Sequence, residues 1–197
     1  MESESADTRR LFFALWPDAD TRATLVEILH GSVPHEVRAT RSENMHITLA
    51  FLGHLDAAAQ HCAEQAAARL RTAPFNITLN HLGYWPHPRI LWLGTSHCPN
   101  ALLDLVAGLH QTLAPCRLAL ETRPYQPHLT VARKVQKMET LPTLRGSVSW
   151  RVRDFVLAES FSDDAGAHYR VLARWPLQLA TQGGGAAPKL GGTMGYF

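Results

Sequence analysis

Two short motifs of histidine and threonine are the residues of this sequence best suited to chemistry. They read HITL at residues 46–49 and HLTV at residues 128–131, so each sets a histidine two places before a threonine and follows both with apolar residues. In a chain with 11 histidines, a lone His-x-Thr is expected by chance roughly once. Two copies that also share the apolar positions are on the order of a one-in-fifty coincidence, so the pair indicates function.

Strand geometry explains what such a motif presents. Residues two apart on a β-strand point to the same face, and the residues between them point to the opposite face. Each motif therefore turns an imidazole and a hydroxyl to one side, His46 with Thr48 and His128 with Thr130. If two similar lobes bring the motifs face to face, one histidine can take a proton from water while the other protonates a leaving oxygen. The threonines can donate hydrogen bonds to phosphate oxygens, which suits attack on a phosphodiester.

A third His-x-Thr serves as an internal comparison. His110 and Thr112 flank a glutamine in a segment predicted to be helical, where residues two apart do not share a face. We expect no catalytic role for this pair. Four other histidines lack a partner pattern and are predicted to lie on the surface or in loops: His54, His81, His87 and His97.

Tyr125 and Arg133 flank the second motif and are candidates for substrate binding. Tyr125 can stack on the terminal base of an RNA, or equally pack where the strand begins. Arg133 can neutralise phosphate charge, but regular alternation points it away from His128 and Thr130. It joins them only if the strand ends or bulges after Ala132.

Several aromatic residues are predicted to pack rather than to bind. Phe51 shares strand parity with Ile47 and Leu49, so we assign it to the core. Four tryptophans are interpreted as core or lobe-interface residues: Trp85, Trp92, Trp150 and Trp175.

The hydrophobic pattern predicts an α+β fold with few obligatory crossovers between parallel strands. Strands are expected at residues 10–15, 44–52, 75–82, 89–94, 117–121, 128–132, 150–159 and 169–176. Helices are expected from a capping Asp18 or Asp20 to residue 30, from a capping Asp56 over residues 57–71, and over residues 99–113. Residues 1–180 form one predicted domain, and the glycine-rich residues 181–197 are predicted to be a flexible tail.

Composition narrows the class of protein. With 46% hydrophobic and 18% charged residues over 197 positions, the chain is typical of a globular protein, and a net charge of +2 favours a small anion or an RNA end over a long duplex. Cys62, Cys98 and Cys116 are odd in number and widely spaced, which argues against a disulfide framework or a zinc site, so we expect reduced thiols. A polar N-terminus and the lack of any membrane-length apolar run predict a cytoplasmic protein.

The chain resembles the 2H phosphoesterase superfamily, named for its paired His-x-Thr motifs, and within it the bacterial and archaeal RNA 2′,3′-cyclic phosphodiesterases once called 2′-5′ RNA ligases. The resemblance extends over nearly all of the chain to about residue 179. It is carried by the segments RLFFAL, NMHITLAFLG, PRILWLG, RPYQPHLTVAR and HYRVLARWPL.

This resemblance implies a bilobal α+β fold, in which two pseudo-symmetric lobes of antiparallel strands flanked by helices surround a central cleft. It implies that His46 protonates the leaving 3′ oxygen, that His128 activates water, and that Thr48 and Thr130 bind phosphate. An HxTxxR pattern, frequent in the family, adds Arg133. The reaction it implies opens RNA 2′,3′-cyclic phosphate ends to 2′-phosphates without metal or cofactor, with weak reverse 2′-5′ ligation, and we expect a monomer.

Other interpretations stay open at this point. A related 2H enzyme can act on small cyclic nucleotides or 2′-5′ oligonucleotides, which the motif chemistry does not separate from RNA ends. A non-catalytic module that binds RNA ends is disfavoured because both motifs are intact. A metalloprotein is disfavoured because the chain has no HExxH motif and no compact cluster of cysteine and histidine.

Overall fold

The structure has the mixed α+β composition that the sequence predicts. The computed structural model describes residues 8–34, 37–136, 138, 140–163 and 166–178, so the predicted tail at residues 181–197 lies outside the described residues. The helices are α1 (Ala19–Ser32), α2 (Ala57–Ala68) and α3 (Asn100–Leu113), with short 3-10 turns η1 (Ser42–Asn44) and η2 (Ala114–Cys116). The strands are β1 (Arg9–Leu15), β2 (Ile47–Leu55), β3 (Phe75–Leu79), β4 (His81–Trp85), β5 (Ile90–Gly94), β6 (His128–Arg133), β7 (Val148–Val152), β8 (Asp154–Asp163) and β9 (Gly166–Pro176).

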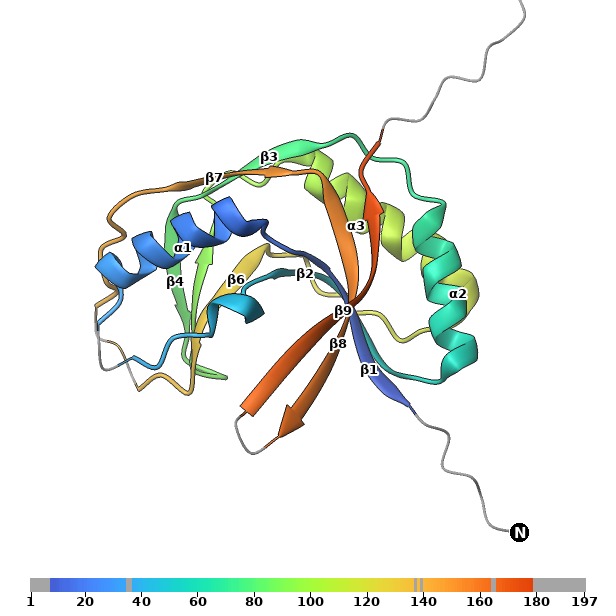
Figure 1. Cartoon of the computed structure of the whole chain (residues 1–197), viewed down its shortest axis with the longest axis horizontal. Coiled ribbons are helices and arrows are strands. Elements are labelled where there is room, and N and C mark those ends of the chain that lie inside the picture. Colours follow the sequence, from blue (N-terminus) through green and yellow to red (C-terminus); the bar gives the residue numbers. More distant parts are fainter. Residues whose placement is uncertain (1–7, 35–36, 137, 139, 164–165, 179–197) are drawn as a thin grey trace, which may run out of the picture.

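Seven of these strands form one antiparallel sheet in the order β4-β5-β6-β2-β1-β8-β9, and β3 pairs with β7 in a separate sheet. The strands that carry the motifs, β2 and β6, are neighbours at the centre of the large sheet (Figure 1). On either side, β1 pairs with β2 and β5 pairs with β6 in the same antiparallel sense. The two halves of the chain therefore share one sheet, and the motifs lie side by side rather than face to face.

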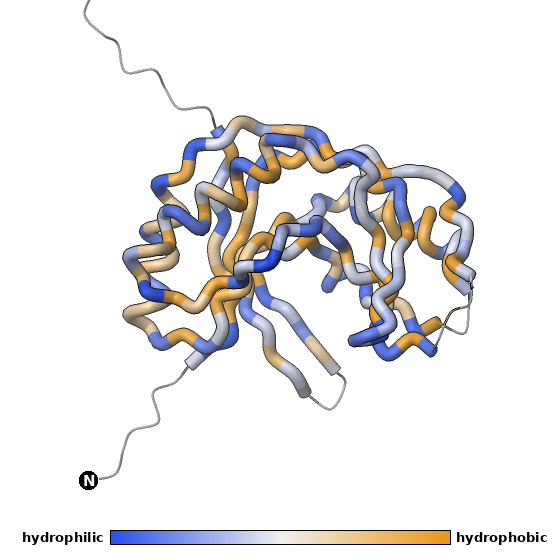
Figure 2. Tube along the Cα trace, turned by 180° about the vertical axis from the view of Figure 1, so that it is seen from behind, coloured by the Kyte–Doolittle hydropathy of each residue, from blue (hydrophilic) through white to orange (hydrophobic). Residues whose placement is uncertain are grey.

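Two of the three helices begin at the aspartates that the sequence predicts as caps. The Asp18 carboxylate accepts a hydrogen bond from the Thr21 backbone N–H at 2.8 Å, and Asp56 accepts one from Ala59 at the same distance. These bonds satisfy backbone donors that the first turn of a helix leaves without partners. Hydrophobic and hydrophilic segments alternate along the helices (Figure 2), as expected for helices that bury one face.

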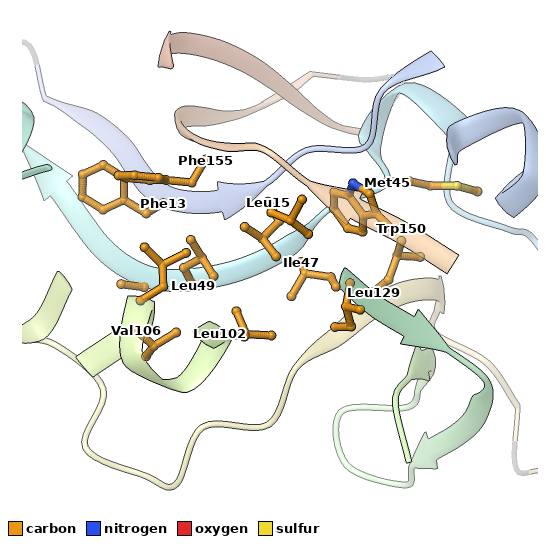
Figure 3. Packing of buried hydrophobic residues seen from close by; sticks show 14 of the residues in the cluster. Phe13, Leu15, Met45, Ile47, Leu49, Leu102, Val106, Leu129, Trp150 and Phe155 are labelled. Carbon is orange, nitrogen blue, oxygen red and sulfur yellow. The ribbon is translucent and has the colours of Figure 1, made fainter. Parts of the chain in front are cut away.

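The core lies between the large sheet and its helices. From the sheet, Ile47 and Leu49 of β2 and Leu129 of β6 point toward Leu102 and Val106 of α3 (Figure 3), and all five side chains are buried. Full burial of one such side chain contributes roughly 1.5–3 kcal/mol. The apolar residues of the two motifs thus anchor the strands, and the alternating residues face the other side of the sheet.

Three predicted strands differ from the structure. The segment at residues 75–82 divides at Asn80 into β3 and β4, which belong to different sheets, and the segment at 150–159 divides at Arg153 into β7 and β8. Asn80 holds the first break, because its backbone N–H donates to Gly94 and its side chain bonds Ser96. Residues 117–121 form no strand, since Arg117 adopts a left-handed conformation with φ 55° as η2 ends.

The prediction that all three cysteines are reduced is wrong for two of them. Cys62 in α2 and Cys116 in η2 form a disulfide, with Cα atoms 5.8 Å apart. Packing of η2 beside α2 brings together two thiols that are 54 residues apart in the sequence, a proximity that spacing alone does not reveal. Cys98 keeps a free thiol.

Candidate active site

The pairing of β2 with β6 places the two motifs around a local twofold axis. Ile47 lies opposite Leu129 in the antiparallel register. The same register sets His46 across from Thr130 and Thr48 across from His128. The two imidazoles therefore lie diagonally across from each other, each opposite the threonine of the other motif. We call the side of the sheet that carries these four residues the motif face.

Both imidazoles are oriented by the same backbone contact. Nδ1 of His46 lies 2.7 Å from the Asn44 carbonyl oxygen, and Nδ1 of His128 lies 2.9 Å from the Gln126 carbonyl oxygen. A carbonyl only accepts, so Nδ1 carries the hydrogen in both rings. This fixes the tautomer and leaves Nε2 of each ring as the nitrogen that can accept or donate a proton.

Three aromatic rings surround His46. Trp16 stacks on it with centroids 5.3 Å apart and planes inclined by 4°, and Phe12 lies at 5.0 Å. Tyr169 of β9 meets it edge-on at 4.9 Å. The His46 ring is therefore held on several sides by apolar surface.

His128 has a more open environment. The Trp85 ring of β4 meets it edge-on at 4.6 Å, and Trp92 packs against Trp85 at 5.2 Å. Trp92 in turn packs against Gly83, where an added Cβ would be 2.0 Å from the indole. Each histidine thus borders aromatic residues of its own half of the sheet.

Burial shifts both histidines toward the neutral form. Burial lowers the pKa of His46 to about 4; the hydrogen bond to the Asn44 carbonyl opposes this shift, and the charges of Arg133 and His128 add to it. Burial also lowers the pKa of His128, against the hydrogen bond to Gln126 and together with the Arg133 charge. In the free protein at pH 7 both imidazoles are therefore predominantly neutral.

Each motif strand contains a β-bulge directly after its threonine. In β2, Thr48 pairs with Ala14, and the next pair joins Ala50 to Phe13. Leu49 is therefore an extra residue without an opposite partner. Leu49 and Ala50 are consecutive residues and both are buried, so the regular alternation of faces is interrupted here.

The bulge in β6 repeats that of β2. Thr130 pairs with Trp92, and the next pair joins Ala132 to Leu91, which leaves Val131 as the extra residue. Val131 and Ala132 are both fully buried. Beyond each bulge, the next side chain on the motif face belongs to Phe51 in β2 and to Arg133 in β6.

The bulges correct the prediction for Phe51 and explain the position of Arg133. Phe51 is 46% exposed and lies 5.6 Å from Phe12, so its assignment to the core is wrong. Arg133 is exposed on the strand that carries His128, and its charge acts on both motif histidines. The sequence requires a bulge or strand end after Ala132 for this; the bulge lies one residue earlier, at Val131.

Of the two roles that the sequence allows for Tyr125, base stacking or packing, the structure shows packing. Its hydroxyl donates to the Thr48 carbonyl at 3.0 Å, and its ring packs against the core. Burial raises the pKa of this hydroxyl well above its usual range. Phe51, and not Tyr125, is the motif-strand aromatic ring that is exposed beside the site.

The remaining predicted histidines and tryptophans divide as follows. His110 lies in α3, where the Thr112 hydroxyl bonds backbone carbonyls of the helix rather than facing the site. The other four histidines are exposed, as predicted: His54, His81, His87 and His97. Trp92 and Trp150 are buried, and Trp175 packs on Phe13 and Phe155. Trp85 borders His128 instead of the core.

Sequence reasoning does not find Trp16, Asn44 or Tyr169. Trp16 follows the first strand by one residue and Asn44 precedes His46 by two, so proximity in the sequence is a usable signal for both. Tyr169 lies 123 residues after His46, and only the sheet order brings it there.

Within the described residues, no group of three or more His, Cys, Asp or Glu side chains is arranged to hold a metal ion. Among the helices of the same residues, none is both long and apolar enough to cross a membrane.

Known proteins share much of this sequence. The RNA 2′,3′-cyclic phosphodiesterase of Escherichia coli (strain K12) is 31% identical over 173 residues, which cover 87% of this chain and 98% of that protein. The RNA 2′,3′-cyclic phosphodiesterase of Thermus thermophilus is 29% identical over 183 residues, covering 86% of this chain and 90% of that protein.

Solved structures show the same fold. E. coli LigT complexed with 3′-AMP superposes with a TM-score of 0.80 at 31% identity, covering 87% of this chain and 99% of that chain. TT0787 of Thermus thermophilus superposes with a TM-score of 0.75 at 27% identity, covering 87% and 100%. A family model of the 2′-5′ RNA ligase superfamily matches residues 17–163. With the paired motifs on one sheet face and this match over most of its length, the chain belongs to the 2′-5′ RNA ligase superfamily of 2H phosphoesterases.

Proposed function

We propose that this protein hydrolyses RNA 2′,3′-cyclic phosphate ends to 2′-phosphates by acid and base catalysis between its two motif histidines. The observation that carries the proposal is the diagonal pair of imidazoles, both held in the same tautomer by a backbone carbonyl at 2.7 and 2.9 Å. The relatives named RNA 2′,3′-cyclic phosphodiesterase support the choice of substrate.

The proposed step is an in-line displacement at phosphorus. Nε2 of His128 takes a proton from water as the water oxygen bonds to phosphorus, and Nε2 of His46 gives a proton to the 3′ oxygen as its bond to phosphorus breaks. Thr48 and Thr130 donate hydrogen bonds to the two non-bridging oxygens, and Arg133 balances the negative charge that builds up. The product carries its phosphate on the 2′ oxygen.

The roles of the two histidines follow from the family resemblance, because the twofold geometry serves either direction. Burial works against His46 as the initial proton donor, since it lowers the pKa of this residue to about 4. An anionic phosphate beside the ring stabilises its protonated form and raises that pKa. We therefore expect His46 to become protonated when substrate binds.

Phe51 is the proposed contact for the base of the terminal nucleotide. This residue is 46% exposed, and the Arg10 guanidinium lies over its ring, 5.7 Å from the centroid. Aromatic faces bind unpaired bases without strong sequence preference. Phe51 thus replaces Tyr125 as the candidate for stacking on the terminal base.

A single assay tests the reaction. A dinucleotide with a 2′,3′-cyclic phosphate end is incubated with the protein in excess EDTA, and the product is identified by phosphorus NMR against authentic 2′- and 3′-nucleotides. We expect undiminished turnover to the 2′-phosphate, because the side chains already provide acid, base and anion donors. Activity lost in EDTA and restored by a divalent ion contradicts the two-histidine scheme. A predominant 3′-phosphate means that the histidine roles or the substrate orientation are exchanged.

A substrate panel then tests the RNA assignment. It contains cyclic mononucleotides, short RNAs with cyclic phosphate ends and 2′-5′ oligonucleotides. We expect kcat/KM to be highest for RNA ends. Reverse reaction uses the same groups, with a 5′-hydroxyl in place of water, so a weak 2′-5′ ligation without ATP is expected. Preference for free cyclic mononucleotides moves the protein to the small-molecule branch of the superfamily.

A further inference from the structure

Asn44 links His46 to a distant part of the chain. Asn44 is only 6% exposed, a low value for a polar residue. Its Nδ2 donates to the Ala167 carbonyl of β9 at 2.9 Å, and its own backbone carbonyl accepts the hydrogen bond from Nδ1 of His46 at 2.7 Å. The group that orients the imidazole is thus attached to a strand 123 residues further along the chain.

Tyr169 makes a second link from the same strand. It lies two residues after Ala167 and meets the His46 ring edge-on at 4.9 Å, with planes inclined by 74°. It also packs edge-on against Phe12, another neighbour of His46. One strand therefore contacts the imidazole and also anchors its hydrogen-bond acceptor.

The hairpin of β8 and β9 extends past the strand on which it is built. β8 pairs with β1 only from Val156 to Ser160, whereas its pairing with β9 runs on to Asp163 (Figure 1). Ala167 belongs to this outer part, since it pairs with Ser162. The hydrogen bond from Asn44 ties the outer hairpin back to the site.

Among the residues that the structure describes, the second motif has no equivalent arrangement. Gln126 stands in the same place relative to His128 as Asn44 does to His46, and its carbonyl accepts from Nδ1 at 2.9 Å. Its side chain, however, is exposed. Gln126 is therefore an internal control for Asn44. Both backbone carbonyls accept from a motif histidine, but only Asn44 is bonded to the hairpin through its side chain.

We propose that the β8–β9 hairpin sets the orientation of the His46 imidazole through Asn44 and Tyr169, which makes these two residues positioning residues for the first histidine and not for the second. The hydrogen bond from the buried Asn44 amide to β9 restrains the Asn44 backbone. Its carbonyl oxygen therefore stays directed at Nδ1 of His46. The edge of Tyr169 limits rotation of the ring.

The test compares matched variants of the full chain, Asn44→Ala with Gln126→Ala and Tyr169→Ala with Tyr169→Phe. Asn44→Ala leaves the backbone carbonyl in place and removes only its anchor, and Tyr169→Phe keeps the ring edge. On the cyclic phosphate dinucleotide we expect kcat to fall about tenfold in Asn44→Ala and Tyr169→Ala with little change in KM, because a misplaced catalytic group slows the chemical step. Gln126→Ala and Tyr169→Phe should stay within about twofold of the parent.

Nitrogen-15 NMR of the imidazoles gives a readout that does not need turnover. The parent should show His46 as the Nδ1–H tautomer, and Asn44→Ala should show a mixture of tautomers while His128 is unchanged. The hydrogen bond to Asn44 raises the pKa of His46, so the variant should titrate at lower pH, since the charged groups Arg133 and His128 keep their places. Tyr169→Ala should change the pKa of His46 less than Asn44→Ala does, because Tyr169 contacts the imidazole through its ring and not through a hydrogen bond.

Two results overturn the inference. One is a loss of activity that follows the melting temperature while the His46 tautomer stays as in the parent. The other is an equal loss in Gln126→Ala. If Asn44→Ala does not fold, the Tyr169 pair decides alone. The activity measurements rest on the proposed function, but the NMR measurements do not: a parent that hydrolyses no cyclic phosphate refutes the function and leaves the tautomer result to decide the positioning role.

Discussion

The catalytic proposal depends on two side chains that the protein orients in the same way. Replacing either His46 or His128 with alanine should reduce kcat roughly 10²- to 10⁴-fold, the usual contribution of a positioned acid or base. Loss of both should add little to the loss of one, because each acts only with the other. Steady-state kinetics with melting temperatures checks this. His110→Ala, in the third His-x-Thr, is the control and should keep parental activity; near-normal turnover of either motif variant removes that histidine from the mechanism.

Arg133 should affect both binding and pH dependence. Its charge lowers the pKa of both motif histidines, so Arg133→Ala should raise both values and move the kcat/KM profile to higher pH. Loss of a charge-assisted phosphate contact should also lower kcat/KM by roughly 10- to 100-fold. Lys134→Ala removes the same charge one residue further along the exposed chain and is the matched control. If both variants shift the profile equally, general surface charge explains the effect and Arg133 has no special position.

At the scale of elements, periodicity predicts strands and helices well and predicts strand register poorly. The caps of α1 and α2 and the extents of β1, β5 and α3 follow from local residue patterns, which depend on a few neighbours in the sequence. The bulges in β2 and β6 depend on which residues pair across strands. Two successive apolar residues after each threonine, Leu49–Ala50 and Val131–Ala132, are the available local signal. Without the pairing, that signal is indistinguishable from an ordinary apolar run, so Phe51 is misassigned.

Close packing of β4 against β5 supports the second histidine. A Cβ at Gly83 would lie 2.0 Å from the Trp92 indole, so Gly83→Ala must displace that ring, which packs against Trp85. We expect a loss of stability of about 1–3 kcal/mol, together with lower activity because Trp85 contacts His128. Gly31→Ala is the control, since a Cβ there meets only Arg145 at an ordinary 3.6 Å and should stabilise α1 by about 0.5 kcal/mol. Thermal unfolding of both variants decides; equal effects contradict the packing argument.

At the scale of the molecule, the two halves of the site meet in one sheet. The repeated motif suggests two similar lobes but not how they join, because the ladder between β2 and β6 consists of the single pair Ile47 and Leu129. The disulfide between Cys62 and Cys116 escapes the sequence for the same reason. What can be predicted is the chemistry of the motifs; their partners from distant strands, such as Tyr169, require the topology.

The combined site predicts an acid-shifted pH profile. The proposed mechanism needs one histidine protonated and one neutral, so kcat/KM should be bell-shaped, with limbs that belong to the pair. Below the lower limb both imidazoles carry protons and no base remains; above the upper limb both are neutral and no acid remains. Because burial lowers the pKa of both, with His46 at about 4, the optimum should lie below pH 6.5. An optimum above pH 7 in a profile of kcat/KM contradicts these shifts in the free protein.

The local twofold between Ile47 and Leu129 has a stereochemical consequence. In the proposed mechanism it gives the two prochiral oxygens of the phosphate equivalent donors, Thr48 on one side and Thr130 on the other. Arg133 breaks this equivalence, because the matching place in the other half is taken by Phe51. Of the Rp and Sp phosphorothioate isomers of a cyclic substrate, the one that turns sulfur toward Arg133 should therefore react more slowly. Arg133→Ala should make the two rates nearly equal, since the site would then discriminate little between the Rp and Sp isomers.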